Sequence, residues 1–157
     1  MSTLLKSLAL VQAKERLEWI NASITRTVNR SYQLLAFIIA INVYLLQGMI
    51  VDIENPIFTG ILLLSTPFNI VIIYHLYFAI QTMTLRSPGT DPDKSKDSMS
   101  RDEDHFYNTK LFSIQISINK NAETLSTVAR NLNISLKLTI AMVIVLMLSL
   151  FAYIAST

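Results

Sequence analysis

The sequence of 157 residues has no cysteine, only three glycines and four prolines, and 15% charged residues. Without cysteine, the chain has neither a disulfide framework nor a thiolate site for metal or redox chemistry. Its glycines stand far apart, which excludes a glycine-rich phosphate loop. A soluble domain of this length carries about 25% charged residues. The shortage of charge therefore predicts that much of the chain does not face water.

Three long runs without a charged residue, 31–51, 56–85 and 138–157, hold most of the hydrophobic residues. Each run reaches the roughly 20 residues that an α-helix needs to cross a hydrocarbon core. Hydrocarbon offers no partners to backbone amides, and the alternation of barrel strands is absent, so the runs are expected to be helical. The sequence predicts an all-α membrane protein whose three transmembrane helices are 31–51, 57–80 and 138–157.

Basic residues are unevenly distributed between the segments outside these runs. Five lie in residues 1–30 and eight in 86–137, whereas the short connection 52–56 has none and contains Asp52 and Glu54. The positive-inside rule then places residues 1–30 and the long connection in the cytoplasm. The same rule predicts that the turn 52–56 and the carboxyl terminus lie outside.

Residues 1–30 are predicted to form a cytoplasmic amphipathic helix that continues into the first transmembrane helix. Its apolar residues recur at spacings of three and four, which places them along one side. They are Leu10, Ala13, Leu17, Ile20, Ile24 and Val28. Residues 81–104 contain two prolines, a glycine and dense mixed charge, and this composition predicts a cytoplasmic linker without a packed core.

Residues 105–137 are predicted to form a long cytoplasmic helical stalk that continues into the third transmembrane helix, because no proline or glycine occurs from 93 to 157. Its expected apolar line is Leu111, Ile114, Ile118, Asn121 or Ala122, Leu125, Val128, Leu132 and Leu136. Two amphipathic helices on one side of a membrane bury their apolar lines against each other or against other copies. A homo-oligomer is therefore expected.

A second stripe of the first helix contains basic residues and the single tryptophan. Two interpretations are open: the arginines reach lipid headgroups beside an interfacial tryptophan, or they bind a phosphate while the indole stacks on a base. In the second interpretation the candidate ligand-binding residues are Arg16, Trp19, Arg26 and Arg30, together with Lys110, Lys120 and Arg130 of the stalk.

Among the polar residues within the predicted spans, Asn42, Asn69 and His75 are the candidates for a functional role. Asn42 and Asn69 are near the middle of the first two runs, at similar depth in an antiparallel hairpin. Their amides are expected to bond across the hairpin, to a helix carbonyl, or between copies. His75 lies toward the cytoplasmic end, and a histidine within a span is a functional candidate.

Catalytic patterns are missing from the sequence. There is no nucleophile elbow and no paired-carboxylate arrangement, and only two histidines are present. The chain is therefore predicted not to be an enzyme and to use no cofactor or metal. Its expected environment is a lipid bilayer, and no nucleic-acid polymer is expected as a partner.

The order of these parts, together with the segments Leu17-Glu-Trp-Ile20, Arg30-Ser-Tyr-Gln-Leu-Leu-Ala-Phe37 and Gln115-Ile116, resembles the Pycsar effector transmembrane family of small bacterial antiphage proteins. The chain departs from the family pattern at Val28, where an acidic residue is expected, and at His105-Phe-Tyr107, where the pattern has Phe-Phe-Gly. The resemblance implies a protein of the bacterial inner membrane. It also implies that the protein is activated by a cyclic nucleotide made during phage infection, and that it then assembles and breaks that membrane.

Two other functions fit the same sequence. One is a constitutive membrane scaffold or accessory subunit whose stalk binds a soluble partner protein, which would explain the amphipathic helices equally well. The other is a small ion channel, which needs polar rings along its pore. Asn42, Asn69 and Ser149 supply few such groups per chain.

The predicted topology can be tested with reporter fusions. Fusions after the amino terminus and at Lys120 are expected to report the cytoplasm, and an insertion in the turn 52–56 is expected to report the opposite side. A result that places Lys120 and the amino terminus on opposite faces of the membrane would contradict the topology and with it the paired cytoplasmic helices.

Overall fold

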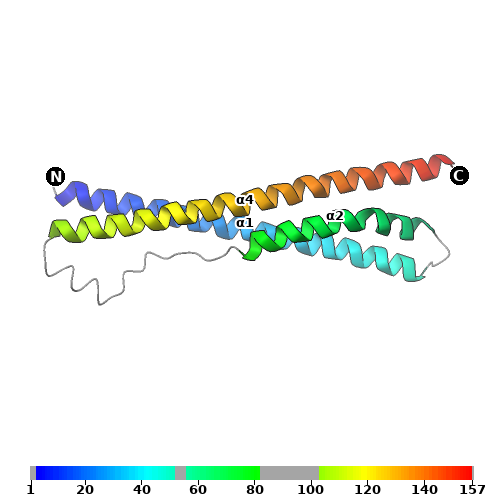
Figure 1. The fold of residues 1–157 in the computed structure, drawn as a ribbon, viewed down its shortest axis with the longest axis horizontal. Coiled ribbons are helices and arrows are strands. Elements are labelled where there is room, and N and C mark those ends of the chain that lie inside the picture. The colour runs from blue at the N-terminus through cyan, green and yellow to red at the C-terminus, as the bar shows by residue number, and fades with distance from the viewer. Residues whose placement is uncertain (1–2, 52–55, 82–102, 157) are drawn as a thin grey trace. The chain divides into compact units, whose positions relative to one another are not determined.

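The chain is described by a computed structural model over residues 3–51, 56–81 and 103–156, all of which are helical (Figure 1). The helices are α1 (Thr3–Val51), α2 (Pro56–Gln81) and α4 (Glu103–Ser156). Each is long and apolar enough to cross a membrane. The predicted all-α fold with three membrane helices is therefore confirmed. Most of the predicted turn and linker, residues 52–55 and 82–102, lies outside the described residues.

Two of the helices run without interruption through the boundaries predicted from the sequence. Helix α1 has 49 residues and α4 has 54, which correspond to lengths of about 73 Å and about 81 Å. Their continuity follows from composition, because proline is absent from both and glycine is absent from α4. The prediction that residues 3–30 and 105–137 are helical and continue as helix into the apolar runs that follow them is confirmed.

Helix α2 contains two prolines, and both lie at positions that the helix accommodates. Pro56 is its first residue, where a backbone N–H would have no partner within the helix. Pro67 lies inside the helix and removes one hydrogen bond from it. Just before Pro67, the hydroxyls of Ser65 and Thr66 donate to the Leu62 carbonyl at 3.0 and 2.7 Å, which adds side-chain bonds at this weakened turn.

The contacts divide the chain into two units. The first contains the described residues of Met1–Arg26 and Met83–Thr127. Its core forms where the start of α1 lies beside the start of α4 (Figure 1). The buried side chains there are Leu17, Ile20 and Ile24 of α1 and Ile114 and Ile118 of α4. All five belong to the apolar lines expected from the sequence.

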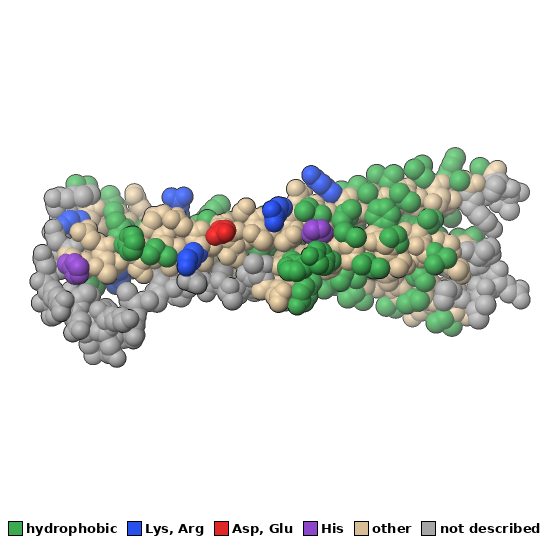
Figure 2. Space-filling model, in the orientation of Figure 1, with side chains coloured by type: hydrophobic (Ala, Val, Ile, Leu, Met, Phe, Trp, Pro, Cys, Tyr) green, Lys and Arg blue, Asp and Glu red, His purple; other side chains and the backbone are tan. Residues whose placement is uncertain are grey.

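The second unit contains the described residues of Thr27–Thr82 and Val128–Thr157, and it brings together parts of all three helices. Its core cluster is formed by Ile38, Ile72, Leu76, Leu132 and Met142. Hydrophobic side chains also cover most of the outer face of this unit in Figure 2. A surface of this kind is stable in hydrocarbon, since lipid tails solvate it as well as protein does.

One part of the predicted apolar line of α4 is wrong. Leu111 and Leu136 are 37% and 42% exposed. In the second unit Val128 and Leu132 of this line are buried, and so are three polar residues that were not part of it, Asn131, Ser135 and Thr139. Small side chains let helix backbones approach closely, and a leucine in the same place would hold them apart. Leu136 therefore turns outward and the small polar residues occupy the helix contact.

The position of the core predicts unequal effects of two identical substitutions in α2. Leu76 is fully buried and Leu63 is 69% exposed. Leu76→Ala is expected to lower the free energy of unfolding by about 2–4 kcal/mol, because it leaves a cavity. Leu63→Ala is expected to have little effect. Unfolding by SDS in mixed micelles, followed by circular dichroism, measures both, and equal losses would contradict the packing of α2.

Candidate functional site

Three of the predicted ligand-binding residues lie on α1 in the first unit. Arg16, Trp19 and Arg26 are all exposed, and the indole of Trp19 is 64% exposed. Arg16 and Trp19 are three residues apart and so lie on adjacent turns of one side of the helix. Neither arginine forms an ion pair with any residue that the structure describes. The guanidinium groups and the face of the indole are therefore open to an external partner.

The basic residues of α4 differ in their surroundings. Lys120 is exposed. Lys110 is half-buried, and its ammonium lies 4.8 Å from the centre of the Phe106 ring, a cation–π contact that already occupies this side chain. Arg30 and Arg130 are exposed and belong to the second unit. The structure thus assigns five of the seven predicted residues to the first unit and two to the other.

A pair of amides joins α1 and α4 within the first unit. The Nδ2 atom of Asn121 donates to Oδ1 of Asn21 at 2.7 Å, and Asn121 is 1% exposed. The sequence placed Asn121 in the apolar line but did not indicate Asn21 as its partner. A polar pair in an apolar helix contact favours one register of the two helices, because a shift breaks the hydrogen bond between them.

His75 contacts α4 through another asparagine. Its Nδ1 atom lies 3.1 Å from Oδ1 of Asn131. An amide oxygen only accepts, so the Nδ1 atom is the donor in this contact. One turn further along α4, the fully buried Ser135 hydroxyl lies 3.0 Å from the Asn131 carbonyl and 3.5 Å from the Ile72 carbonyl. His75 therefore belongs to a polar contact that joins α2 to α4.

The residues of α4 in this contact were not predicted from the sequence. Asn131, Ser135 and Thr139 recur at intervals of four, so they lie on one side of the helix, and all three are buried. Small residues at this spacing are typical of helix contacts inside membranes. That spacing was the signal that could have identified them, but the leucines beside them gave a stronger apolar pattern.

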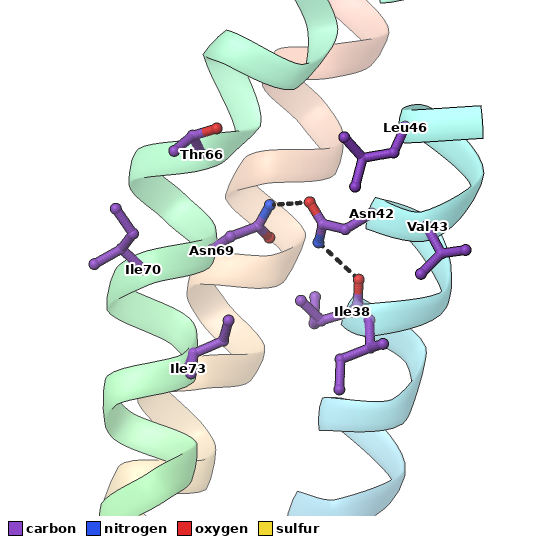
Figure 3. A pocket seen from close by; sticks show the side chains of 9 residues that line it. Ile38, Asn42, Val43, Leu46, Thr66, Asn69, Ile70 and Ile73 are labelled. Atoms are coloured by element: carbon purple, nitrogen blue, oxygen red, sulfur yellow. Dashed lines mark hydrogen bonds between the residues drawn. The ribbon is translucent and has the colours of Figure 1, made fainter. Parts of the chain in front are cut away.

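Asn42 and Asn69 point toward each other across the hairpin of α1 and α2 (Figure 3). Nδ2 of Asn69 donates to Oδ1 of Asn42 at 2.8 Å, and Nδ2 of Asn42 donates to the Ile38 carbonyl at 2.7 Å. Two of the three partners predicted for these amides are therefore present. Asn69 is 7% exposed, and its Oδ1 has no partner among the described residues. A buried acceptor left in this state costs about 1–3 kcal/mol.

The two asparagines line a groove of about 250 Å³ between α1 and α2. Its walls are apolar apart from Thr66. They are formed by Ile38, Ile39, Val43 and Leu46 of α1 and by Thr66, Ile70 and Ile73 of α2 (Figure 3). None of the predicted basic residues lines this groove. It is therefore a separate candidate site, suited to apolar side chains and one hydrogen-bonding group.

The close contact of α2 and α4 predicts that a larger side chain at Ser135 is not tolerated. Ser135→Leu is expected to lower the free energy of unfolding by about 1–3 kcal/mol through overpacking. Asn133 is exposed two residues away, so Asn133→Leu adds a leucine without filling the contact and is expected to be nearly neutral. SDS titration of both variants measures the difference, which should vanish if α2 and α4 do not pack here.

Comparison of the chain with models of known protein families, with curated proteins and with solved structures found no match. Proposals about its function therefore rest on two candidate sites. They are the exposed face of α1 that contains Arg16, Trp19 and Arg26, and the groove that contains Asn42 and Asn69.

Proposed function

We propose that this protein is a ligand-triggered membrane effector whose basic helices bind a cyclic mononucleotide. The observation that carries the proposal is the exposed stripe of Arg16, Trp19 and Arg26 on a helix that continues unbroken into an apolar membrane segment. Binding at one end of such a helix acts on the element that packs in the bilayer. In a bacterium, the effector would assemble in the inner membrane during phage infection and disrupt it.

The chemistry of the stripe suits a phosphate attached to an aromatic base. A guanidinium group binds phosphate oxygens through two parallel N–H donors. An indole face stacks on any nucleobase, and such stacking is worth about 1–3 kcal/mol. Arg16 and Trp19 are separated by a rise of only about 4.5 Å along the helix. One mononucleotide can therefore contact both side chains.

The trigger requires the ligand to favour the assembled state over the separate one. A ligand shifts such an equilibrium only by the difference between its affinities for the two states. Residues 105–137 of the stalk contain four basic residues and one acidic residue. Basic stalks from neighbouring copies repel one another, so an anion held between them binds the assembled state more tightly.

A second candidate function, a scaffold that binds a soluble protein, is favoured by apolar side chains on the surface of the first unit. Phe112 is 68% exposed and Ile116 is 41% exposed on α4. On α1, Leu8 and Val11 are each about half exposed, at 51% and 50%. These residues lie outside the predicted spans, where exposed aromatic and aliphatic side chains commonly mark a protein interface. Stoichiometric co-purification of one soluble protein, lost on Phe112→Ser, would support this function.

The ligand-binding face can be tested on the detergent-solubilised protein with a panel of cyclic nucleotides. At least one cyclic mononucleotide is expected to bind. Arg16→Ala is expected to weaken its binding roughly 10-fold or more, since a hydrogen bond to a charged group is worth about 1.5–3 kcal/mol. Trp19→Ala is expected to weaken binding several-fold, whereas Trp19→Phe keeps an aromatic face.

Lys14 provides the matched control for this experiment. It is an exposed basic residue of the same helix but lies off the stripe, so Lys14→Ala should leave the affinity nearly unchanged. An equal loss in Lys14→Ala and Arg16→Ala would mean that only general positive charge matters. The absence of binding to every nucleotide in the panel would exclude the nucleotide form of the proposal.

A further inference from the structure

We propose that the groove between α1 and α2 is the surface through which a second copy of this chain docks in the bilayer, with the Asn69 amides of the two copies bonded to each other. The inference deepens the part of the proposed function that concerns assembly of copies in the membrane. It rests on the association of copies in the bilayer but not on any particular ligand.

The side chain of Asn69 has more hydrogen-bonding groups than it uses. A carboxamide has two N–H donors and one oxygen acceptor. One donor of Asn69 is used by Oδ1 of Asn42, at 2.8 Å. Its oxygen is unpartnered among the described residues, although the side chain is only 7% exposed and lines the groove. One donor and one acceptor of the same amide therefore remain for a partner.

The surroundings of the groove limit what can bond to the unused groups of Asn69. Lipid tails contain no hydrogen-bond donor, so an acyl chain in the groove would leave the oxygen unsatisfied. All copies of one membrane protein insert with the same orientation, and a two-fold axis along the membrane normal brings each residue to the depth of its own counterpart. The remaining donor and acceptor of Asn69 are self-complementary. A second copy therefore supplies the hydrogen-bond donor and acceptor that the groove lacks.

The walls of the groove have a residue spacing that suits contact with a neighbouring helix. Ile39, Val43 and Leu46 on α1 follow the same four-then-three spacing as Thr66, Ile70 and Ile73 on α2, and all six are exposed. This is the spacing at which side chains of one helix fit between those of another. A groove of about 250 Å³ has room for side chains of a neighbouring helix rather than for a whole helix. The Thr66 hydroxyl already donates to the Leu62 carbonyl at 2.7 Å, so it does not oppose an apolar contact.

Cysteine cross-linking in native membranes tests the location of the interface, and the natural absence of cysteine makes the wild-type chain a clean background. Ile70 of α2 and Ile140 of α4 are isoleucines of similar exposure, 64% and 61%, but only Ile70 lines the groove. Ile70→Cys is expected to form a disulfide-linked dimer on mild oxidation, and Ile140→Cys is expected to form little. Equal cross-linking at both positions, or none at Ile70→Cys, would overturn the proposal in favour of lipid-filled grooves.

A second pair of variants, each made in the Ile70→Cys background, separates the contact between copies from the bond within the hairpin. Asn69→Leu removes both groups that would bond to the second copy, and it should reduce the dimer roughly three-fold or more. Asn42→Leu breaks the same internal hydrogen bond but leaves the Asn69 amide in place, so the dimer should persist. If both variants lose the dimer equally, the asparagines serve only the hairpin and the proposal fails.

These outcomes are independent of nucleotide binding. A chain that binds no cyclic nucleotide but cross-links at Ile70→Cys in an Asn69-dependent manner would retain the docking surface and lose the proposed trigger. A chain that binds a nucleotide through Arg16 but does not cross-link would retain the trigger and require another surface for assembly.

Discussion

Hydrocarbon supplies no hydrogen-bond partners, and the described structure follows from this constraint. It forces the backbone into continuous helices, and it requires each polar side chain in a span to find a partner on the same helix or the next one. The hydroxyl of Ser149 donates to the Val145 carbonyl of its own helix at 2.9 Å. Asparagine has more groups to satisfy, and the Asn42 amide therefore marks a place where two helices meet.

The same constraint explains which parts of the fold could be predicted. Length and charge alone gave the three helices, because no other regular structure in a single chain satisfies an apolar run of this length. Helix partners were harder to predict, because small polar side chains let helix backbones approach more closely than leucines do. The pattern of large apolar residues therefore placed Leu136 in the contact, although Ser135 beside it is the buried residue.

The candidate sites were predictable to different degrees. The Asn42–Asn69 bond was one of three alternatives that two polar residues at matching depth in a hairpin left open. The pairing of Asn21 with Asn121 did not follow, because it joins residues 100 positions apart. No spacing rule relates such positions before the helices are placed side by side. The exposed stripe of α1 was predictable as a stripe, but a pattern of exposed residues does not specify what binds to it.

Helix α2 has a distinct position among the polar contacts of the second unit. Asn69 bonds it to α1, and His75, with the Ile72 carbonyl, bonds it to α4. Among the described residues, no buried side-chain atom of the contact with α4 lacks a partner, whereas the contact with α1 leaves Oδ1 of Asn69 unpartnered. A new partner beside α1 therefore costs fewer hydrogen bonds than a new partner beside α4, because the Asn69 amide can gain hydrogen bonds at the α1 contact. If copies of the chain assemble, the α1–α2 side of the second unit is where a new contact satisfies a buried polar group.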